Sequence, residues 1–287
     1  MSQRDLDRRV IDTNYLEKPE LARWLGARKT NIAVIAHPTM IELHRRDALR
    51  TIQQALRICC QYSRQVVILR STDQLIALTG RGKGLVNRLV SPDETRQFGA
   101  YCRTVIEVAP TSEIVDHVAP LEVQARELRD ALARSAANLI VRLKQADDIL
   151  TAGERRELRG MVSNRRPMSG PLQRKTCAMA FDLAQELTQA AGLAPLVATA
   201  DRNDIVNRLA FRYGAMIVGY YVVAKDHDGR WISNPDKQLR QVFDLKIASL
   251  ASYFDGLMTA EGDLAASYRI GRSLIAALGG YVRCGRG

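Results

Sequence analysis

The sequence has few cysteines, and their arrangement marks neither a zinc site nor a disulfide framework. They number five, which is odd, and none belongs to a C-x-x-C pair. Zinc sites and disulfide-rich scaffolds depend on paired, closely spaced cysteines. We therefore expect structural or incidental thiols. The cysteines are Cys59, Cys60, Cys102, Cys177 and Cys284.

Long apolar runs are also missing from the 287 residues. No stretch is long enough to span a bilayer, and the first residues, 1–5, do not form a signal peptide. We find no internal repeat and no low-complexity segment. These absences lead us to expect a cytoplasmic protein with no membrane partner.

A nucleotide-binding P-loop is missing as well. The glycine-rich basic stretch 79–84 (TGRGKG) lacks the G-x-x-x-x-G-K-[ST] spacing that cradles nucleotide phosphates. A solvated loop is the simpler interpretation, and a contact with a phosphate backbone is the alternative.

Negative charge is scarce relative to positive charge. The chain has 42 Lys and Arg against 31 Asp and Glu, a formal net charge of +11. Such a balance favours polyanionic partners, with nucleic acid first. The most basic locality is 153–175, which is a candidate RNA-contacting segment or simply a solvated face. The arginines that we single out in it are Arg155, Arg156, Arg159, Arg165 and Arg166.

Short apolar runs alternate with helical patterns over the first 70 residues. The runs at 10–11, 31–36 and 65–69 are typical of buried strands, and helices are expected over 15–29 and from residue 39. Strands that alternate with helices indicate a parallel sheet with crossover helices. The fold class is therefore predicted as α/β.

The pattern changes from residue 71 onward. We predict a discontinuous domain, 1–75 with 236–287, and a mainly helical insertion over 76–235. Residues 216–223 could instead be a strand. The other elements that we expect are helices over 121–150, 176–191, 204–223, 241–253 and 270–278, a short strand over 254–259 and an edge strand over 281–283.

Acidic residues recur beside these predicted strand ends. Asp12 follows the first strand, Glu42 opens the helix after the second, and Asp244 lies in the first turns of a late helix. Glu261 and Asp263 follow a late strand. In a parallel sheet such positions converge on one edge, and clustered carboxylates select Mg²⁺ or Mn²⁺. A site of this kind suits metal-assisted phosphodiester hydrolysis.

Four blocks of sequence together resemble the PIN-domain nucleases. This family has D-T-N after its first strand, an acid followed by Leu on the next helix, a D-x-x-I-A-x-x-A helix and a strand that ends T-x-D-x-D-hydrophobic. The order and the local spacing match here. The blocks are Val10–Asn14, Pro38–Leu43, Asp244–Ala251 and Gly256–Leu264.

The resemblance implies a PIN-like α/β/α three-layer fold with a central, mostly parallel sheet. It also implies an Mg²⁺- or Mn²⁺-dependent ribonuclease, often the toxin of a toxin–antitoxin pair, with RNA as substrate. An antitoxin or other protein partner and a homo-oligomer are further possibilities.

The same resemblance suggests roles for individual residues. Asp12, Glu42 and Asp244 are similar to the family's metal-binding acids. Glu261 stands where the family usually has Asp, and Asp263 matches the second acid of that motif, so either can be the fourth acid. The supporting polar residues are Asn14 and Thr259.

Simpler interpretations remain open for each acid. Asp12 could be a helix cap, and Glu42 and Asp244 could complement a helix dipole. For the whole protein, the alternatives are a non-catalytic RNA- or protein-binding member of the PIN-like group and a nuclease directed at DNA.

Overall fold

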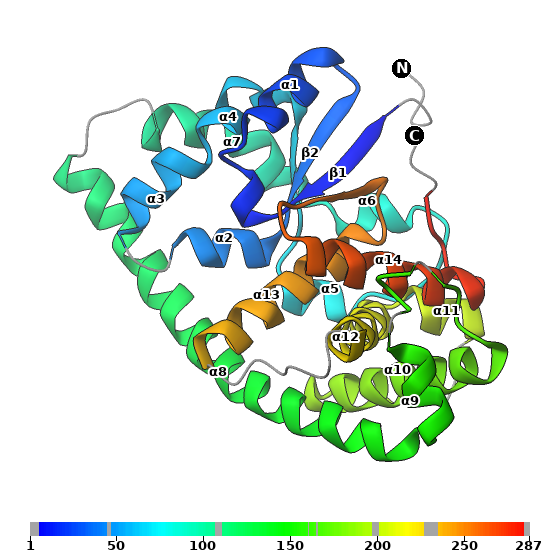
Figure 1. The fold of residues 1–287 in the computed structure, drawn as a ribbon. Coiled ribbons are helices and arrows are strands. Elements are labelled where there is room, and N and C mark those ends of the chain that lie inside the picture. Colours follow the sequence, from blue (N-terminus) through cyan, green and yellow to red (C-terminus); the bar gives the residue numbers. More distant parts are fainter. Residues whose placement is uncertain are drawn as a thin grey trace.

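The computed structural model describes residues 6–44, 47–106, 111–159, 161–164, 166–196, 201–226 and 235–283. Its centre is a four-stranded parallel sheet in the order β3-β2-β1-β4 (Figure 1). The α/β class and the parallel sheet predicted from the sequence are confirmed. The strands are β1 (Asp7–Ile11), β2 (Asn31–Ile35), β3 (Val66–Ile68) and β4 (Gly256–Met258).

The sheet is buried on both faces, which explains why its strands are short continuous apolar runs. Successive side chains of a strand point to opposite faces. Val10 packs into the hydrophobic cluster on one face, and Ile11 packs into the cluster on the other. Both side chains are fully buried. Parallel strands covered on both sides lack polar alternation for this reason.

Helices from the N-terminal part of the chain cover one face. Leu21, Ile52 and Phe98 belong to the same buried cluster as Ile11 and Ile35. The helices on this side are α1 (Pro19–Ala27), α3 (Ala48–Ala55), α4 (Arg57–Gln61) and α7 (Pro92–Val105).

A disulfide joins two of these helices. Cys60 of α4 bonds to Cys102 of α7, with their Cα atoms 5.5 Å apart. The expectation of structural or incidental thiols is wrong for this pair, because two helices whose cysteines are 42 residues apart in the sequence meet on the sheet. Cys59 and Cys177 are free and buried. Cys284 lies outside the described residues.

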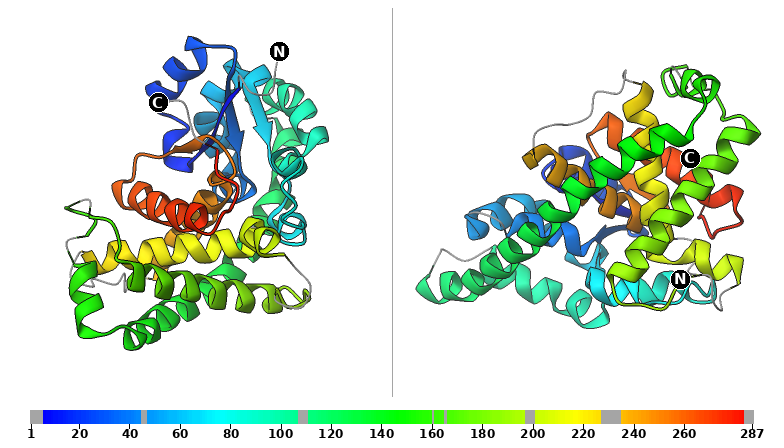
Figure 2. Two further views of the ribbon diagram at one scale, coloured as in Figure 1. Left: turned by 90° about the vertical axis from the view of Figure 1, so that its right-hand side faces the viewer. Right: turned by 90° about the horizontal axis from the view of Figure 1, so that it is seen from below.

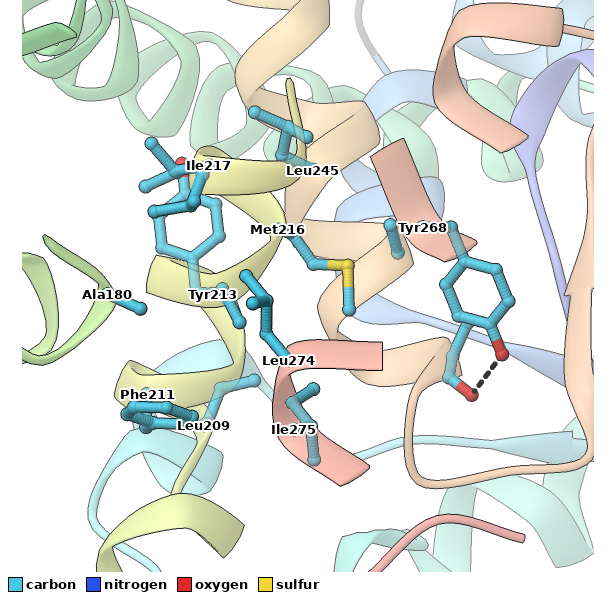
Figure 3. Packing of buried hydrophobic residues seen from close by; sticks show 14 of the residues in the cluster. Ala180, Leu209, Phe211, Tyr213, Met216, Ile217, Leu245, Tyr268, Leu274 and Ile275 are labelled. Carbon is cyan, nitrogen blue, oxygen red and sulfur yellow. Dashed lines mark hydrogen bonds between the residues drawn. The ribbon is translucent and has the colours of Figure 1, made fainter. Parts of the chain in front are cut away.

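Helices from the middle and end of the chain cover the other face. Figure 2 shows α14 (Gly262–Ala277), α12 (Leu209–Asp226) and α10 (Gly170–Ala190) as successive layers leading away from the sheet. Helix α13 (Pro235–Ala251) packs beside them and against β1. Figure 3 shows how Phe211 and Met216 of α12 and Leu274 of α14 fill the space between these layers.

Helix α12 is buried on all sides. Its side chains from Leu209 to Ala224 are all buried. The strand considered for 216–223 is therefore part of a helix, and its apolar residues face α10, α13 and α14 at once. An all-round apolar helix is typical of a central position in a larger core.

The single helix predicted from residue 39 is divided into separate helices. Helix α2 (His37–Leu43) ends at Leu43, and α3 begins at Ala48 after Asp47, whose φ is +45°. The predicted edge strand over 281–283 is also wrong. Tyr281 donates its N–H to the side chain of Asn207, and Arg212 donates to its carbonyl, so side chains satisfy this backbone.

The remaining elements connect the layers, and α8 is the longest of them. None of the helices in the described ranges is long and apolar enough to cross a membrane. These elements are η2 (Thr13–Tyr15), η3 (Ser63–Gln65), α5 (Thr72–Ile76), α6 (Leu85–Leu89), α8 (Ser112–Ile149), α9 (Ala152–Leu158) and α11 (Arg202–Asn207).

The described residues of 76–235 are helical or irregular and form no strand of the sheet. They do not stand apart from it, because Phe211 and Val218 share one hydrophobic cluster with Val10 and Val34. The division into a discontinuous domain and an insertion stays a prediction.

Candidate metal centre in a carboxylate cleft

The strand order reverses beside β1, and a cleft lies at the carboxyl end of this strand. β2 and β3 lie on one side of β1 and β4 on the other. Ligands of parallel α/β sheets bind outside the carboxyl ends of the strands at such a reversal. The cleft has a volume of about 300 Å³. Its lining includes the predicted acids Asp12, Glu42, Asp244 and Glu261.

Asp12 follows β1, caps the start of η2 and lines the cleft. Its Oδ1 accepts a hydrogen bond of 2.8 Å from the Thr13 backbone N–H. Its Oδ2 accepts one of 2.7 Å from Thr259 Oγ1. Burial, with the nearby charge of Glu261 adding to it, raises the pKa of Asp12 to about 6. The capping role and the site role are therefore compatible.

Glu42 reaches the cleft from the last turn of α2. The sequence placed it at the start of this helix, but α2 begins at His37 and has no acid in its first turn. An interaction with the positive end of the helix dipole therefore does not explain Glu42. Thr13 Oγ1 donates a short hydrogen bond to its Oε2, which ties α2 to the segment after β1.

Asp244 enters the cleft from the middle of α13. The expectation that it lies in the first turns is wrong, because the helix begins at Pro235. Its side chain is buried, and burial is the largest cause of a rise in its pKa to about 9. The negative charges of Asp12, Glu261 and Glu42 raise it further, and Arg240 opposes them. Asp244 is thus close enough to the other three acids for their charges to repel its own.

Glu261 is the fourth acid that the structure brings into the cleft. Asn14 Nδ2 donates to Glu261 Oε1 at 3.0 Å, and Asn14 Oδ1 accepts from the Ala260 N–H at 3.2 Å. Asp263 is exposed in the first turn of α14 and does not line the cleft. Of the two acids that the sequence left open, the geometry brings Glu261 to the other three.

The supporting residues Asn14 and Thr259 lie between the acids. Thr259 Oγ1 donates to Asp12 and accepts a hydrogen bond of 3.1 Å from the Glu261 N–H. Asn14 connects the segment after β1 to the segment after β4. Both residues therefore hold acids from separate segments in one place.

The sequence interpretation missed two charged residues of the cleft, Glu17 and Arg240. Arg240 precedes Asp244 by four residues, a spacing that brings side chains to one face of a helix. The helix predicted over 241–253 does not include Arg240, so the sequence pattern gives no sign of this position. Glu17 follows η2 and gave no periodic signal.

The residues of the basic segment 153–175 that the structure describes do not line the cleft. Arg155 and Arg156 lie on α9, which follows the C-terminal end of α8 (Figure 1). α3, beside the cleft, packs near the other end of α8, where the Ala48 N–H donates to Glu122. Roughly 40 Å of helix separates these places at 1.5 Å per residue. Arg159 and Arg166 are also exposed and away from the cleft lining. Arg165 lies outside the described residues.

The oxygen atoms in the cleft are of the chemical kinds that bind a divalent cation, but the side chains that carry them are not placed around one. Carboxylate, hydroxyl and amide oxygens are hard ligands that Mg²⁺ and Mn²⁺ prefer, and a cation would offset the repulsion that Asp244 experiences. Yet no three Asp, Glu, His or Cys side chains of the described residues are placed to hold one ion. Glu42 and Glu261 are turned toward Thr13 and Asn14. In each glutamate, one carboxylate oxygen accepts a hydrogen bond from that neighbour.

Comparisons of the chain with protein-family models, with curated proteins and with solved structures each gave no match. The resemblance to PIN-domain nucleases, and the RNA substrate, metal ion and antitoxin partner that it implies, stay predictions. The protein has a parallel α/β fold that gathers four carboxylates at its strand-order reversal.

Proposed function

We propose that the protein is a divalent-metal-dependent endoribonuclease with a PIN-like site. One observation carries this proposal: acids from four separate segments line a single cleft at the carboxyl edge of the sheet. The acids are Asp12 after β1, Glu42 on α2, Asp244 on α13 and Glu261 before α14.

The electrostatic cost of this arrangement supports a functional origin. Asp12 and Asp244 are both buried, and their pKa values are raised by burial and by neighbouring carboxylates. Arg240 is the single cation among the described lining residues. Buried carboxylates that repel one another destabilise a fold and are concentrated at functional sites.

A bound Mg²⁺ or Mn²⁺ ion would lower the pKa of a coordinated water and neutralise charge on a phosphodiester. Asp12, Glu42, Asp244 and Glu261 would hold the ion. Thr259 fixes the orientation of Asp12, and Thr13 fixes that of Glu42. Arg240 adds a positive charge that attracts the phosphate of the substrate.

The direct test is cleavage of end-labelled single-stranded RNA with Mg²⁺, with Mn²⁺ and with EDTA. We expect cleavage in either metal, none in EDTA, and a loss of at least about a hundredfold in Asp12→Asn and in Asp244→Asn, since each removes a charged ligand. Circular dichroism checks that the variants fold. Undiminished cleavage by folded Asp12→Asn contradicts the proposal.

The fourth acid has its own matched pair of variants. Glu261→Gln removes a carboxylate that lines the cleft, and Asp263→Asn removes an exposed one nearby that does not. We expect the first variant to lose cleavage and the second to retain it. The opposite result assigns the role to Asp263.

A non-catalytic RNA- or protein-binding role is the second candidate. The lack of three metal-binding side chains at ligand spacing in the described residues favours it. Calorimetry with Mn²⁺ separates the candidates: absence of metal binding alongside intact RNA binding supports the second. Matched DNA and RNA substrates separate the DNA-directed alternative. Growth arrest on expression that is relieved by Asp12→Asn supports a toxin role.

A further inference from the structure

The glycine-rich loop 79–84 joins α5 to α6 and lies outside the lining of the carboxylate cleft (Figure 1). Its two cationic side chains, Arg81 and Lys83, are exposed. The sequence has no acid between Asp73 and Asp93. The loop is therefore a small surface of positive charge.

The loop is held in one shape from two sides. Arg88 of α6 donates to Thr79 Oγ1 at 3.1 Å and to the carbonyl of Arg81. On the other side, Gly80 packs against the backbone of α11: a Cβ atom there would lie 1.8 Å from the carbonyl oxygen of Asp204. These contacts order the loop before any ligand binds, which lowers the entropic cost of binding.

The two glycines that flank Lys83 leave the backbone of the loop accessible. A Cβ atom built on Gly82 or on Gly84 would have no atom of the described residues within 4 Å, its chain neighbours aside. Glycine allows a ligand to approach the peptide groups closely, and backbone N–H groups in such turns attract anions. An anion can therefore reach both the side chains and the backbone here.

Acids on the neighbouring elements do not cancel this charge. Residues 201–208, in and around α11, include two acids and two arginines, so their charges balance. Asp204 pairs with Arg208 at 2.8 Å. On α5, the charge of Asp73 acts on Lys246 of α13, where it opposes the lowering of the lysine pKa by burial. The positive charge of the loop thus remains available to an external anion.

The side chains of the loop favour nucleic acid over a membrane as the source of this anion. The segment TGRGKG has no apolar or aromatic side chain that could enter a bilayer or stack on a base. It can contact phosphates only, and such contacts carry no information about the base sequence. The net charge of +11 favours a polyanion in the same way.

We propose that loop 79–84 binds the phosphodiester backbone of a nucleic acid, with Arg81 and Lys83 each neutralising one phosphate. Because the loop reads neither the bases nor the 2′-hydroxyl, it binds RNA and DNA of the same length alike. This surface is separate from the carboxylate cleft and does not depend on the proposed nuclease activity.

The test is fluorescence anisotropy of the full chain with labelled single-stranded RNA and DNA of one sequence, about 20 nucleotides long, at several salt concentrations. EDTA is present throughout, so the proposed cleavage does not interfere. Each phosphate contact contributes about 0.7 to the slope of log affinity against log salt for single strands. We expect Arg81→Ala/Lys83→Ala to reduce this slope by about 1.4 and to weaken binding of both strands by about tenfold to thirtyfold at about 0.1 M salt.

Arg28→Ala/Lys29→Ala is the matched control. It removes two exposed cations from the segment between α1 and β2, so the net charge changes equally. We expect the slope and the affinity of the wild type. Circular dichroism checks that both variants fold.

Three results would overturn the proposal. The first is a wild type that binds neither strand, and the second is an equal loss in both variants, which would show a dependence on net charge alone. The third is tighter binding to vesicles that contain phosphatidylserine than to either strand, lost in Arg81→Ala/Lys83→Ala, which would assign the loop to a membrane.

Discussion

Arg212 is a fully buried guanidinium that joins three parts of the chain. It donates to Asn207 Oδ1 and to Ser252 Oγ, both at 2.9 Å, and to the carbonyl of Tyr281. Its guanidinium carbon also lies 3.8 Å from the centre of the Tyr253 ring. Through these contacts α12 holds the end of α13 and the segment after α14. Burial lowers the pKa of Arg212 to about 10, so it stays charged at pH 7.

Replacing Arg212 should therefore destabilise the protein. Arg212→Met removes the three hydrogen bonds that the buried guanidinium donates, and we expect the free energy of unfolding to fall by about 3 kcal/mol. Urea denaturation measures this change. Arg208→Met is the control: its salt bridge with Asp204 is partly exposed, so we expect a loss below about 1 kcal/mol. Equal losses in both variants contradict the role of Arg212.

Asp244 makes the stability of the metal-free protein depend on pH. Its pKa is about 9 in the folded protein, against about 4 in an unfolded chain. A raised pKa means that the protonated folded form is favoured, so this contribution to stability is complete below about pH 4 and is lost as the pH rises toward 9. Asp12, with a pKa of about 6, adds a smaller loss of stability over a lower pH range.

Asp244→Asn should remove most of this dependence, because the amide does not ionise. We expect the wild-type Tm in EDTA to be lower at pH 8 than at pH 5, and this decline to be reduced in the variant. Mn²⁺ should raise the wild-type Tm more at pH 8, where the carboxylates need a counter-charge. Asp263→Asn serves as the control with wild-type behaviour. An unchanged decline in Asp244→Asn counts against this explanation.

At the scale of elements, the core strands were predictable and several helix limits were not. The runs at 10–11, 31–36 and 65–69 are strands or strand ends because a sheet buried on both faces needs unbroken apolar residues. The start of α13 was missed because 235–240 contains a single large apolar side chain, Leu239, too few to show a helical period. That error also hid Arg240.

In the candidate site, too, the features that depend on local sequence were predicted and those that depend on long-range packing were not. Asp12 and Glu42 were found because each stands directly after a predicted strand or near its end. The choice between Glu261 and Asp263 depended on the direction of two side chains around the start of α14, which a spacing pattern does not encode. The disulfide between α4 and α7 likewise depended on how two helices meet.

The contact between α12 and α14 permits a prediction about a glycine. A Cβ atom built on Gly219 would lie 2.3 Å from the carbonyl oxygen of Ser267, so the helices approach too closely for any side chain there. We expect Gly219→Ala to lower the free energy of unfolding by about 1–3 kcal/mol, because backbone must shift. Thermal or urea denaturation measures it.

Gly153 provides the control for this prediction. It is at an exposed position of helix α9, and an added Cβ would have its nearest contact at an ordinary 3.9 Å from Thr151 Oγ1. Alanine is the better helix former by about 1 kcal/mol, so Gly153→Ala should be neutral or stabilising. Destabilisation by both substitutions to the same extent would show that the close approach of α12 and α14 is not the cause.

At the scale of the whole molecule, one core joins parts of the chain that are distant in sequence. Val10 and Val34 of the sheet, Phe211 of α12 and Leu274 of α14 belong to one buried cluster. Removing the middle of the chain would expose the sheet face that α12 and its neighbours cover. A core shared in this way couples the folding of its parts.

We therefore expect the chain to unfold in one cooperative transition, even though the sequence suggested a domain with an insertion. Calorimetry should give a ratio of calorimetric to van't Hoff enthalpy near one. Arg212→Met, which loosens the junction of α12 with the C-terminal segments, should lower the single Tm without splitting the transition. Two transitions in the wild type, one of them insensitive to this substitution, would instead support an insertion that folds on its own.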